Sequence, residues 1–234
     1  MKLDELIPVL SRTELFGHLS EEAVREIAPK GIRRRHKKGE LIFRQGDEGR
    51  TVYVLLGGLA KIFLTSERGD EMLLATLQAP ATFGELALID GLPRSASVEA
   101  IEPVETLAFN VTDLIELSKA NGSFSTGLLE SLAGLIRRLT DQASDFVFLD
   151  LHGRVAKLLL NFVDTRGEHT DEGIVLDLHL TQGDLARMVG GSRQSVNQIL
   201  GMLSNRGYLA LYGRKIVIKR LDLLRRRAGL EPFA

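Results

Sequence analysis

The stretch from residue 31 to about residue 110 constrains the fold most, because its apolar segments are short and glycines separate them. Two of these segments, residues 52–56 and 59–63, are rich in β-branched, aromatic and aliphatic residues and flank the pair Gly57-Gly58. Other glycines interrupt the stretch at Gly31, Gly39, Gly46, Gly49, Gly69 and Gly91. Many short strands with closely spaced turns predict an antiparallel barrel or roll.

Helical patterns flank this β-rich stretch. The first 30 residues are predicted to be helical, with Ser20 as a start signal before apolar residues at helical spacing. A second helical pattern covers residues 111–120 and breaks at Asn121-Gly122. It resumes at Ser123 and continues to about residue 147 as one long helix.

The long helix carries a stripe of mostly apolar residues, with one polar member, at alternating spacings of four and three: Leu128, Leu132, Leu135, Leu139, Gln142 and Phe146. One interpretation is that this stripe packs against its own barrel. We favour a parallel homodimer through residues 123–147, because such a heptad pattern suits a partner helix.

Composition limits the chemistry. A chain of 234 residues with 44% hydrophobic and 26% charged residues can bury a core of one or two domains. The absence of cysteine excludes disulfides, thiolate nucleophiles and cysteine-held iron–sulfur clusters. No apolar run is long enough for a membrane span, and acidic residues follow Met1-Lys2, so we expect a cytoplasmic protein with no membrane partner.

The charge is unevenly distributed along the chain. Residues 1–150 hold 17 Lys and Arg against 23 Asp and Glu, whereas residues 151–234 hold 13 against 8. A basic third attached to an acidic body is expected when one domain approaches a polyanion. Nucleic acid is therefore the leading candidate partner.

Residues 180–208 predict a helix-turn-helix. Thr181 is typical of a helix N-cap with Asp184 three residues on, and Gly190-Gly191 predicts a tight turn before a second cap at Ser192. Apolar residues recur at the inward positions of both helices: Leu185, Met188, Val189, Val196, Ile199, Leu200 and Leu203. A predicted β-hairpin, residues 208–211 and 215–218, would make the motif winged.

The outward side chains of the second helix suit DNA bases, since Arg can pair with guanine and Gln or Asn with adenine. Hydroxyls and helix N-termini can hold phosphates. We predict DNA contacts from Thr181, Gln182, Ser192, Arg193, Gln194, Asn197, Gln198 and, at the wing tip, Arg214. The alternative is a helical hairpin with a solvated polar face.

Residues 83–98 stand apart within the β-rich half. Gly84 opens a short helical turn whose N–H groups could face an anion, Arg94 could pair with that anion, and Glu85 could accept from a sugar hydroxyl. These are the parts of a ribose-phosphate pocket. The same residue types also occur in ordinary solvated loops.

Four motifs in collinear order resemble the CRP/FNR family of bacterial transcription factors. They are Gly46-Asp47-Glu48-Gly49 with the strand after it, residues 83–98, residues 148–156, and residues 189–193. The resemblance implies an α+β fold with an N-terminal cyclic-nucleotide-binding antiparallel β-roll (jelly roll), a long dimerisation helix and a C-terminal winged helix-turn-helix. The domains would span residues 1–122, 123–150 and 151–234.

The resemblance also implies roles for single residues. Backbone N–H groups of Gly84, Leu86 and Ala87 would face the cyclic phosphate of a nucleotide such as cyclic AMP, with Arg94 and Ser95 on its oxygens. Glu85 would accept from the ribose 2′-hydroxyl. No metal is expected.

The chain departs from the family pattern at both sites. Where cyclic-AMP responders carry a Thr-Ser pair against the base, this chain has Leu139 and Thr140, so one hydroxyl is missing. Where readers of the TGTGA half-site carry Arg, Glu and Arg, it has Arg193, Gln194 and Gln198. We therefore expect an altered half-site within palindromic double-stranded promoter DNA.

The function predicted from these features is a homodimeric DNA-binding regulator under cyclic-nucleotide control, with RNA polymerase as a further partner. The polar loop 165–173 could meet the polymerase or be a plain turn. One alternative is a regulator of the same fold that answers to cyclic GMP or a cyclic dinucleotide, or to no ligand. An enzyme is disfavoured because no nucleophile motif, P-loop or metal-ligand spacing is present.

Overall fold

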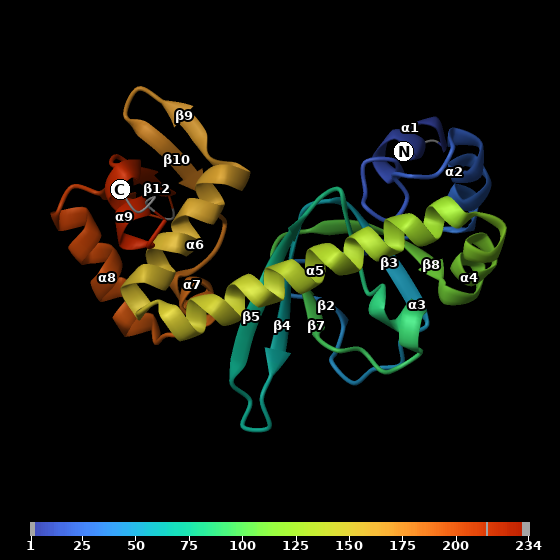
Figure 1. Cartoon of the computed structure of the whole chain (residues 1–234), viewed down its shortest axis with the longest axis horizontal. Helices are drawn as coiled ribbons and strands as arrows, with labels where there is room; N and C mark the ends of the chain where they lie inside the picture. Colours follow the sequence, from blue (N-terminus) through green and yellow to red (C-terminus); the bar gives the residue numbers. More distant parts are fainter. Residues whose placement is uncertain (1–2, 214, 231–234) are drawn as a thin grey trace. The chain divides into compact units, whose positions relative to one another are not determined.

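The computed structural model describes residues 3–213 and 215–230. The chain forms two compact units, Met1–Arg138 and Leu139–Ala234, and each is described by itself (Figure 1). Within the described ranges, none of the helices combines the length and the apolar character that a membrane crossing requires.

The first unit is built on two four-stranded antiparallel sheets, as the glycine-separated segments predicted. Their strand orders are β1-β8-β3-β6 and β2-β7-β4-β5. The turn between β3 and β4 needs glycine, because Gly58 has φ +87° and a Cβ there would lie 2.5 Å from the Pro103 carbonyl oxygen. The strands are β1 Ile32–His36, β2 Leu41–Phe43, β3 Thr51–Gly57, β4 Leu59–Thr65, β5 Glu71–Gln78, β6 Ala81–Phe83, β7 Ser97–Ala100 and β8 Val104–Asn110.

Along the chain, helices precede and follow the strands of this roll. The predicted cap at Ser20 is confirmed, since its hydroxyl accepts from the Ala23 N–H that begins α2. The helical elements of the first unit are α1 Leu3–Leu10, α2 Glu21–Ile27, the 3₁₀ turn η1 Ala28–Lys30, α3 Leu86–Asp90, α4 Val111–Ala120 and the start of α5 Gly122–Phe148.

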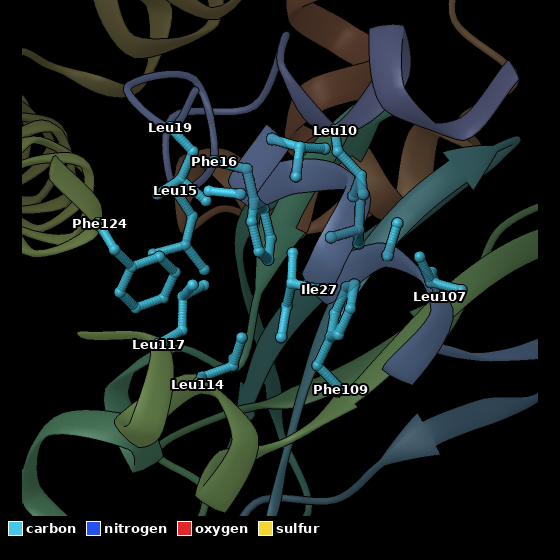
Figure 2. Close-up of a cluster of buried hydrophobic side chains, with 14 of the residues drawn as sticks. Leu10, Leu15, Phe16, Leu19, Ile27, Leu107, Phe109, Leu114, Leu117 and Phe124 are labelled. Atoms are coloured by element: carbon cyan, nitrogen blue, oxygen red, sulfur yellow. The ribbon is translucent and has the colours of Figure 1, made fainter. Parts of the chain in front are cut away.

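Two apolar clusters lie among the described residues of this unit. In the first, the N-terminal helices pack with α4 and α5 onto β3 and β8 (Figure 2). Phe16 lies at its centre, 5.3 Å from the Phe109 ring and 5.8 Å from the Phe124 ring between centroids. The second cluster joins the two sheets: Tyr53, Leu55, Ala60, Phe83, Val98, Ala100, Val104 and Ala108.

Helix α5 buries one side against its own unit and exposes another. A Cβ on Gly127 would lie 2.6 Å from the Glu14 carbonyl oxygen, so the helix approaches the N-terminal segment closely there. Leu128, which the heptad pattern assigned to the exposed seam, packs partly against the core. Five other apolar residues follow one another at spacings of three and four along another side of α5: Leu129, Leu132, Ile136, Leu139 and Ala143. Leu132 is half-buried and the other four are exposed, Leu129 by 66% and Ile136 by 63%.

In its described residues, the second unit holds the end of α5, four further helices and one four-stranded sheet. The sheet has the order β11-β12-β10-β9. This arrangement confirms the predicted winged helix-turn-helix. The elements are α6 Leu151–Arg166, β9 Glu168–Thr170, β10 Gly173–Asp177, α7 Gln182–Val189, α8 Arg193–Asn205, β11 Leu209–Tyr212, β12 Lys215–Ile218 and α9 Leu221–Arg227.

Helix α6 begins at Leu151, because the Asp150 carboxylate caps it by accepting from the Gly153 N–H at 2.7 Å. One sequence-based expectation in this unit was wrong. The region expected to be a polar loop, residues 165–173, contains the end of α6 and strand β9 instead. Its polar residues gave no β signal, and pairing with β10 overrides that local preference.

Candidate functional site

The turn after β6 provides a backbone cradle. Gly84 has φ +82°, a conformation that favours glycine, and leads into the single turn of α3. Gly91 closes this turn in the left-handed conformation with φ +65°. The first N–H groups of a helical turn have no partners within it, so Leu86 and Ala87 present backbone donors beside Gly84.

Arg94 is the side chain around which this cradle is arranged. It is buried, and its Nη1 donates to the Gly84 carbonyl oxygen at 2.9 Å while Nη2 donates to the Thr51 carbonyl oxygen. Its backbone N–H donates to the Asp47 carbonyl oxygen, and its own carbonyl oxygen accepts from the Gly46 N–H, each at 2.8 Å. These two hydrogen bonds hold the backbone of Arg94 against Gly46 and Asp47.

The guanidinium also lies over an aromatic surface. Its central carbon is 4.2 Å from the centroid of the Phe43 ring and 5.8 Å from that of Tyr53. Burial lowers the pKa of the Arg94 guanidinium, and the nearby Tyr53 and Asp47 oppose that shift. Among the described residues, the buried Nε of Arg94 has no hydrogen-bond partner.

Gly49 lets the preceding loop approach the cradle. A Cβ on this residue would lie 2.2 Å from the Ala87 Cβ and 3.1 Å from the Leu92 carbonyl oxygen. Any larger residue would push the loop away from α3. The sequence motif at residues 46–49 indicated a turn but not this contact.

Glu85 and Ser95 flank Arg94. Burial raises the pKa of the Glu85 carboxyl, although its backbone hydrogen bond and the charges of Arg138 and Arg94 act in the opposite direction. Ser95, the next residue after Arg94, is exposed. The buried Arg94 guanidinium, whose Nε has no partner among the described residues, the backbone N–H groups at the start of α3 and the Glu85 carboxyl group fit a ligand with one anionic group and a hydroxyl, which a cyclic nucleotide has.

Leu139 and Thr140 follow Arg138 on α5 and begin the second unit. Both side chains are exposed, Leu139 by 44%. Their assigned contact with a nucleotide base stays a prediction.

The first helix of the helix-turn-helix is capped as predicted. The Thr181 hydroxyl accepts from the Asp184 N–H at 3.1 Å, and the Thr181 N–H donates to the Asp184 carboxylate at 2.8 Å. The Thr181 hydroxyl also donates a hydrogen bond to that carboxylate. Burial raises the pKa of Asp184, but the bonds from Thr181 and the Arg187 guanidinium outweigh it and lower the pKa overall.

The second helix, α8, separates its apolar and polar sides. Ser192 caps it by accepting from the Ser195 N–H at 3.0 Å. Val196, Ile199, Leu200 and Leu203 are buried as predicted. The predicted base-reading residues are all exposed: Arg193, Gln194, Asn197 and Gln198. Gln182, at the start of α7, is half-buried.

The turn between these helices is tied to the end of α5. Gly190 has φ +63°, and a Cβ there would lie 2.6 Å from the Phe146 ring. Arg154 donates from Nε to the Val189 carbonyl oxygen at 2.9 Å and from Nη1 to the Leu149 carbonyl oxygen at 2.8 Å. Its guanidinium lies 5.1 Å from the centroid of the Phe146 ring. Sequence analysis missed this residue, since no local pattern reports such a contact.

The wing follows α8 as the strand pair β11 and β12. Tyr212 at its tip is 56% exposed, and Lys215 pairs with Asp177 at 3.1 Å. Arg214 lies outside the described residues. Across residues 3–213 and 215–230, no cluster of three or more His, Asp or Glu side chains could hold a metal ion.

Two protein-family models match the chain. The model for the cyclic nucleotide-binding domain matches residues 33–121, and that for the Crp-like helix-turn-helix domain matches residues 153–227. A CRP-like cAMP-activated global transcriptional regulator of Mycobacterium tuberculosis is 30% identical over 94% of this chain and 98% of its own length. The chain belongs to the CRP/FNR family.

Solved structures agree with this family fold. The catabolite activator protein of Thermus thermophilus is 30% identical, with a TM-score of 0.53 over 93% of this chain and all of its own. The c-di-GMP responsive global regulator CLP of Xanthomonas campestris is 23% identical, with a TM-score of 0.76 over 85% of this chain and 99% of its own. The chain is thus a DNA-binding transcription regulator with a cyclic nucleotide-binding domain.

Proposed function

We propose that this CRP/FNR family member is a homodimer whose binding to promoter DNA is controlled by a cyclic nucleotide, with cyclic AMP the first candidate. The supporting observation is the buried Arg94 guanidinium, which lies beside the Gly84 turn with its Nε unpartnered among the described residues. The relatives named as cAMP-activated regulators favour this nucleotide. The role is binding and regulation, without catalysis.

In this proposal the cyclic phosphate accepts hydrogen bonds from Arg94, from the Ser95 hydroxyl and from the backbone N–H groups of Gly84, Leu86 and Ala87. Charge-assisted hydrogen bonds of this kind are stronger than neutral ones. Glu85 accepts from the ribose 2′-hydroxyl, and Leu139 and Thr140 border the base. The sensor spans residues 1–122, the dimerisation helix and hinge 123–150, and the DNA-binding domain 151–234.

The exposed stripe of α5 supports the homodimer. Leu129, Leu132, Ile136, Leu139 and Ala143 recur at spacings of three and four, which places them on one seam of a helix. Large apolar side chains more than half exposed, such as Leu129 and Ile136, suit a surface that another helix covers.

Two recognition helices in a dimer would read the halves of a palindrome about one DNA turn apart, roughly 34 Å. For the nucleotide to control this step, it must bind the DNA-competent arrangement more tightly than the other, by about 5- to 150-fold. Bound at a promoter, the dimer would then contact RNA polymerase.

A second candidate is the same regulator with a different effector, such as cyclic GMP or a cyclic dinucleotide, or with none. Leu139 favours this possibility, because it cannot donate to a base as a hydroxyl would. The Xanthomonas relative is named as c-di-GMP responsive.

Calorimetric titration of the purified protein with cyclic AMP, cyclic GMP and cyclic di-GMP tests the proposal. We expect binding of cyclic AMP that weakens at least about tenfold in Ser95→Ala and in Glu85→Gln, and further in Arg94→Ala. Ser95 is exposed and Glu85→Gln is isosteric, so both variants should keep the fold. The matched control is Arg50→Ala, because Arg50 is 81% exposed and pairs only with the equally exposed Glu48 among the described residues.

Binding of another nucleotide with the same loss in these variants would replace cyclic AMP as the effector. Absence of heat with every nucleotide, from a folded protein that still binds DNA, would overturn nucleotide control.

A further inference from the structure

The exposed side of the recognition helix has an unusual composition. In the first two turns of α8, the exposed side chains after the Ser192 cap are one guanidinium and three amides: Arg193, Gln194, Asn197 and Gln198. No carboxylate occurs anywhere on α8. Among the described residues, none of these four side chains is engaged in a hydrogen bond or ion pair within the chain.

The geometry places these groups in two rows. Arg193 and Asn197 are four residues apart, as are Gln194 and Gln198, so the members of each pair lie one turn above the other on the same helix face. Gly201 extends the row of Arg193 and Asn197 with no side chain, and a Cβ there would meet no atom within 4 Å. The last position of that row therefore makes no base contact of its own.

The chemistry of base edges then determines what this surface can read. In the major groove, a guanidinium pairs with guanine O6 and N7, and an amide pairs with adenine N6 and N7. Cytosine presents the N4 amino group as a donor, for which a carboxylate is the matching acceptor. This helix supplies one group for guanine, three for adenine and no carboxylate for cytosine.

We infer that each half-site contains a single G·C pair read by Arg193, and that the steps read by Gln194 and Gln198 are A·T pairs. This inference rests on the DNA-binding part of the proposed function and does not depend on which nucleotide binds the roll. It makes Gln194 and Gln198 specificity-determining residues.

Selection from a random library of duplex DNA tests the inference with the full-length protein. Four parallel selections would contain no nucleotide, cyclic AMP, cyclic GMP or cyclic di-GMP. We expect palindromes whose half-sites hold one conserved G·C pair next to conserved A·T pairs. Replacing one A·T pair at a glutamine step by G·C should weaken binding about tenfold, measured by fluorescence anisotropy.

A paired substitution should convert the predicted preference. Gln194→Glu with Gln198→Arg supplies an acceptor for cytosine N4 and a second guanidinium for guanine, so the preferred pairs at the steps read by these two residues should change from A·T to G·C. The control is Asn205→Asp, which makes the same amide-to-carboxylate change at an exposed residue near the end of α8 and should leave the preference unchanged.

Enrichment of half-sites with G·C at the glutamine steps would overturn the inference and leave DNA binding standing. A double variant that binds but keeps the A·T preference would also overturn it. No enrichment in any of the four selections would overturn both the inference and the proposed DNA recognition.

Discussion

At the scale of single residues, a glycine in the cyclic nucleotide-binding domain leaves room for the Arg94 guanidinium. Gly84 combines a left-handed φ of +82° with a Cβ position only 2.6 Å from Arg94 Nη1. Glycine is therefore required at position 84 for two separate reasons, the positive φ and the lack of room for a Cβ. Substitutions can measure the two effects separately.

Gly84→Ala should displace the Arg94 guanidinium and weaken nucleotide binding at least about tenfold, since the charged hydrogen bonds lose their geometry. The left-handed backbone adds about 1 kcal/mol of destabilisation. Gly69→Ala is the control, because Gly69 has φ +86° and an open Cβ position. Calorimetry and thermal unfolding of both variants separate the two costs, and equal nucleotide affinity in both would contradict the steric argument.

Asp184 makes the stability of the DNA-binding unit depend on pH in the acid range. Because its pKa in the folded state is lowered, the capping box contributes full stability above the ordinary aspartate pKa of about 4 and loses it as the pH falls through the folded-state pKa. We expect Asp184→Asn to destabilise the protein by about 1 kcal/mol at pH 7 and by less at pH 3. Urea unfolding at both pH values measures this, and an equal loss at both would exclude the carboxylate charge as the cause.

At the scale of elements, sequence patterns predicted the parts that local chemistry determines. The caps at Ser20, Thr181 and Ser192 and the glycine turns follow from residue type and spacing, and the structure confirms them. The contacts of Arg94 with the Thr51 carbonyl and the Phe43 ring were not predictable, because they join segments more than forty residues apart. Periodicity also could not decide whether Leu128 or Leu129 packs on the roll, since adjacent residues differ by only 100° around a helix.

The turn of the helix-turn-helix shows how one element positions another. The Phe146 ring lies against Gly190, and Arg154 holds the Val189 carbonyl while stacking on the same ring. The end of α5 and the turn before the recognition helix are therefore packed together within the second unit.

Gly190→Ala should force the Phe146 ring from this turn and cost about 1–3 kcal/mol beyond the strain of a left-handed alanine. Gly207→Ala is the matched control, because Gly207 has φ +72° and no atom within 4 Å of its Cβ position. We expect a larger fall in the thermal unfolding temperature of the Gly190 variant and a weaker affinity for the selected palindrome. Equal unfolding temperatures for the two variants would show that the ring contact does not hold the turn.

At the scale of the whole molecule, the boundary between the two compact units falls inside α5, between Arg138 and Leu139. The exposed stripe runs across that boundary, from Leu129 to Ala143. In the proposed dimer, one helix pairing would therefore involve both units of each chain, so loss of the pairing should affect DNA binding as well as association.

Ile136→Glu tests this link, because it places a charge in the middle of the stripe where the proposed partner helix would bury it. Burial of an unpaired charge is strongly unfavourable, so we expect the dissociation constant of the dimer to be at least about a hundredfold larger than that of the unaltered protein. Ser144→Glu adds the same charge at an exposed residue outside the stripe and should leave association unchanged. Sedimentation velocity measures the association state of both variants.

The DNA affinity of the Ile136 variant tests whether pairing of α5 links the two recognition helices. Two linked recognition helices gain about 10²- to 10⁴-fold in affinity over one, because the second contact is intramolecular. A monomeric variant should lose this factor on the full palindrome, yet bind a single half-site about as well as the unaltered chain does. If it becomes monomeric and still binds the palindrome with unaltered affinity, α5 is not what presents the two recognition helices together.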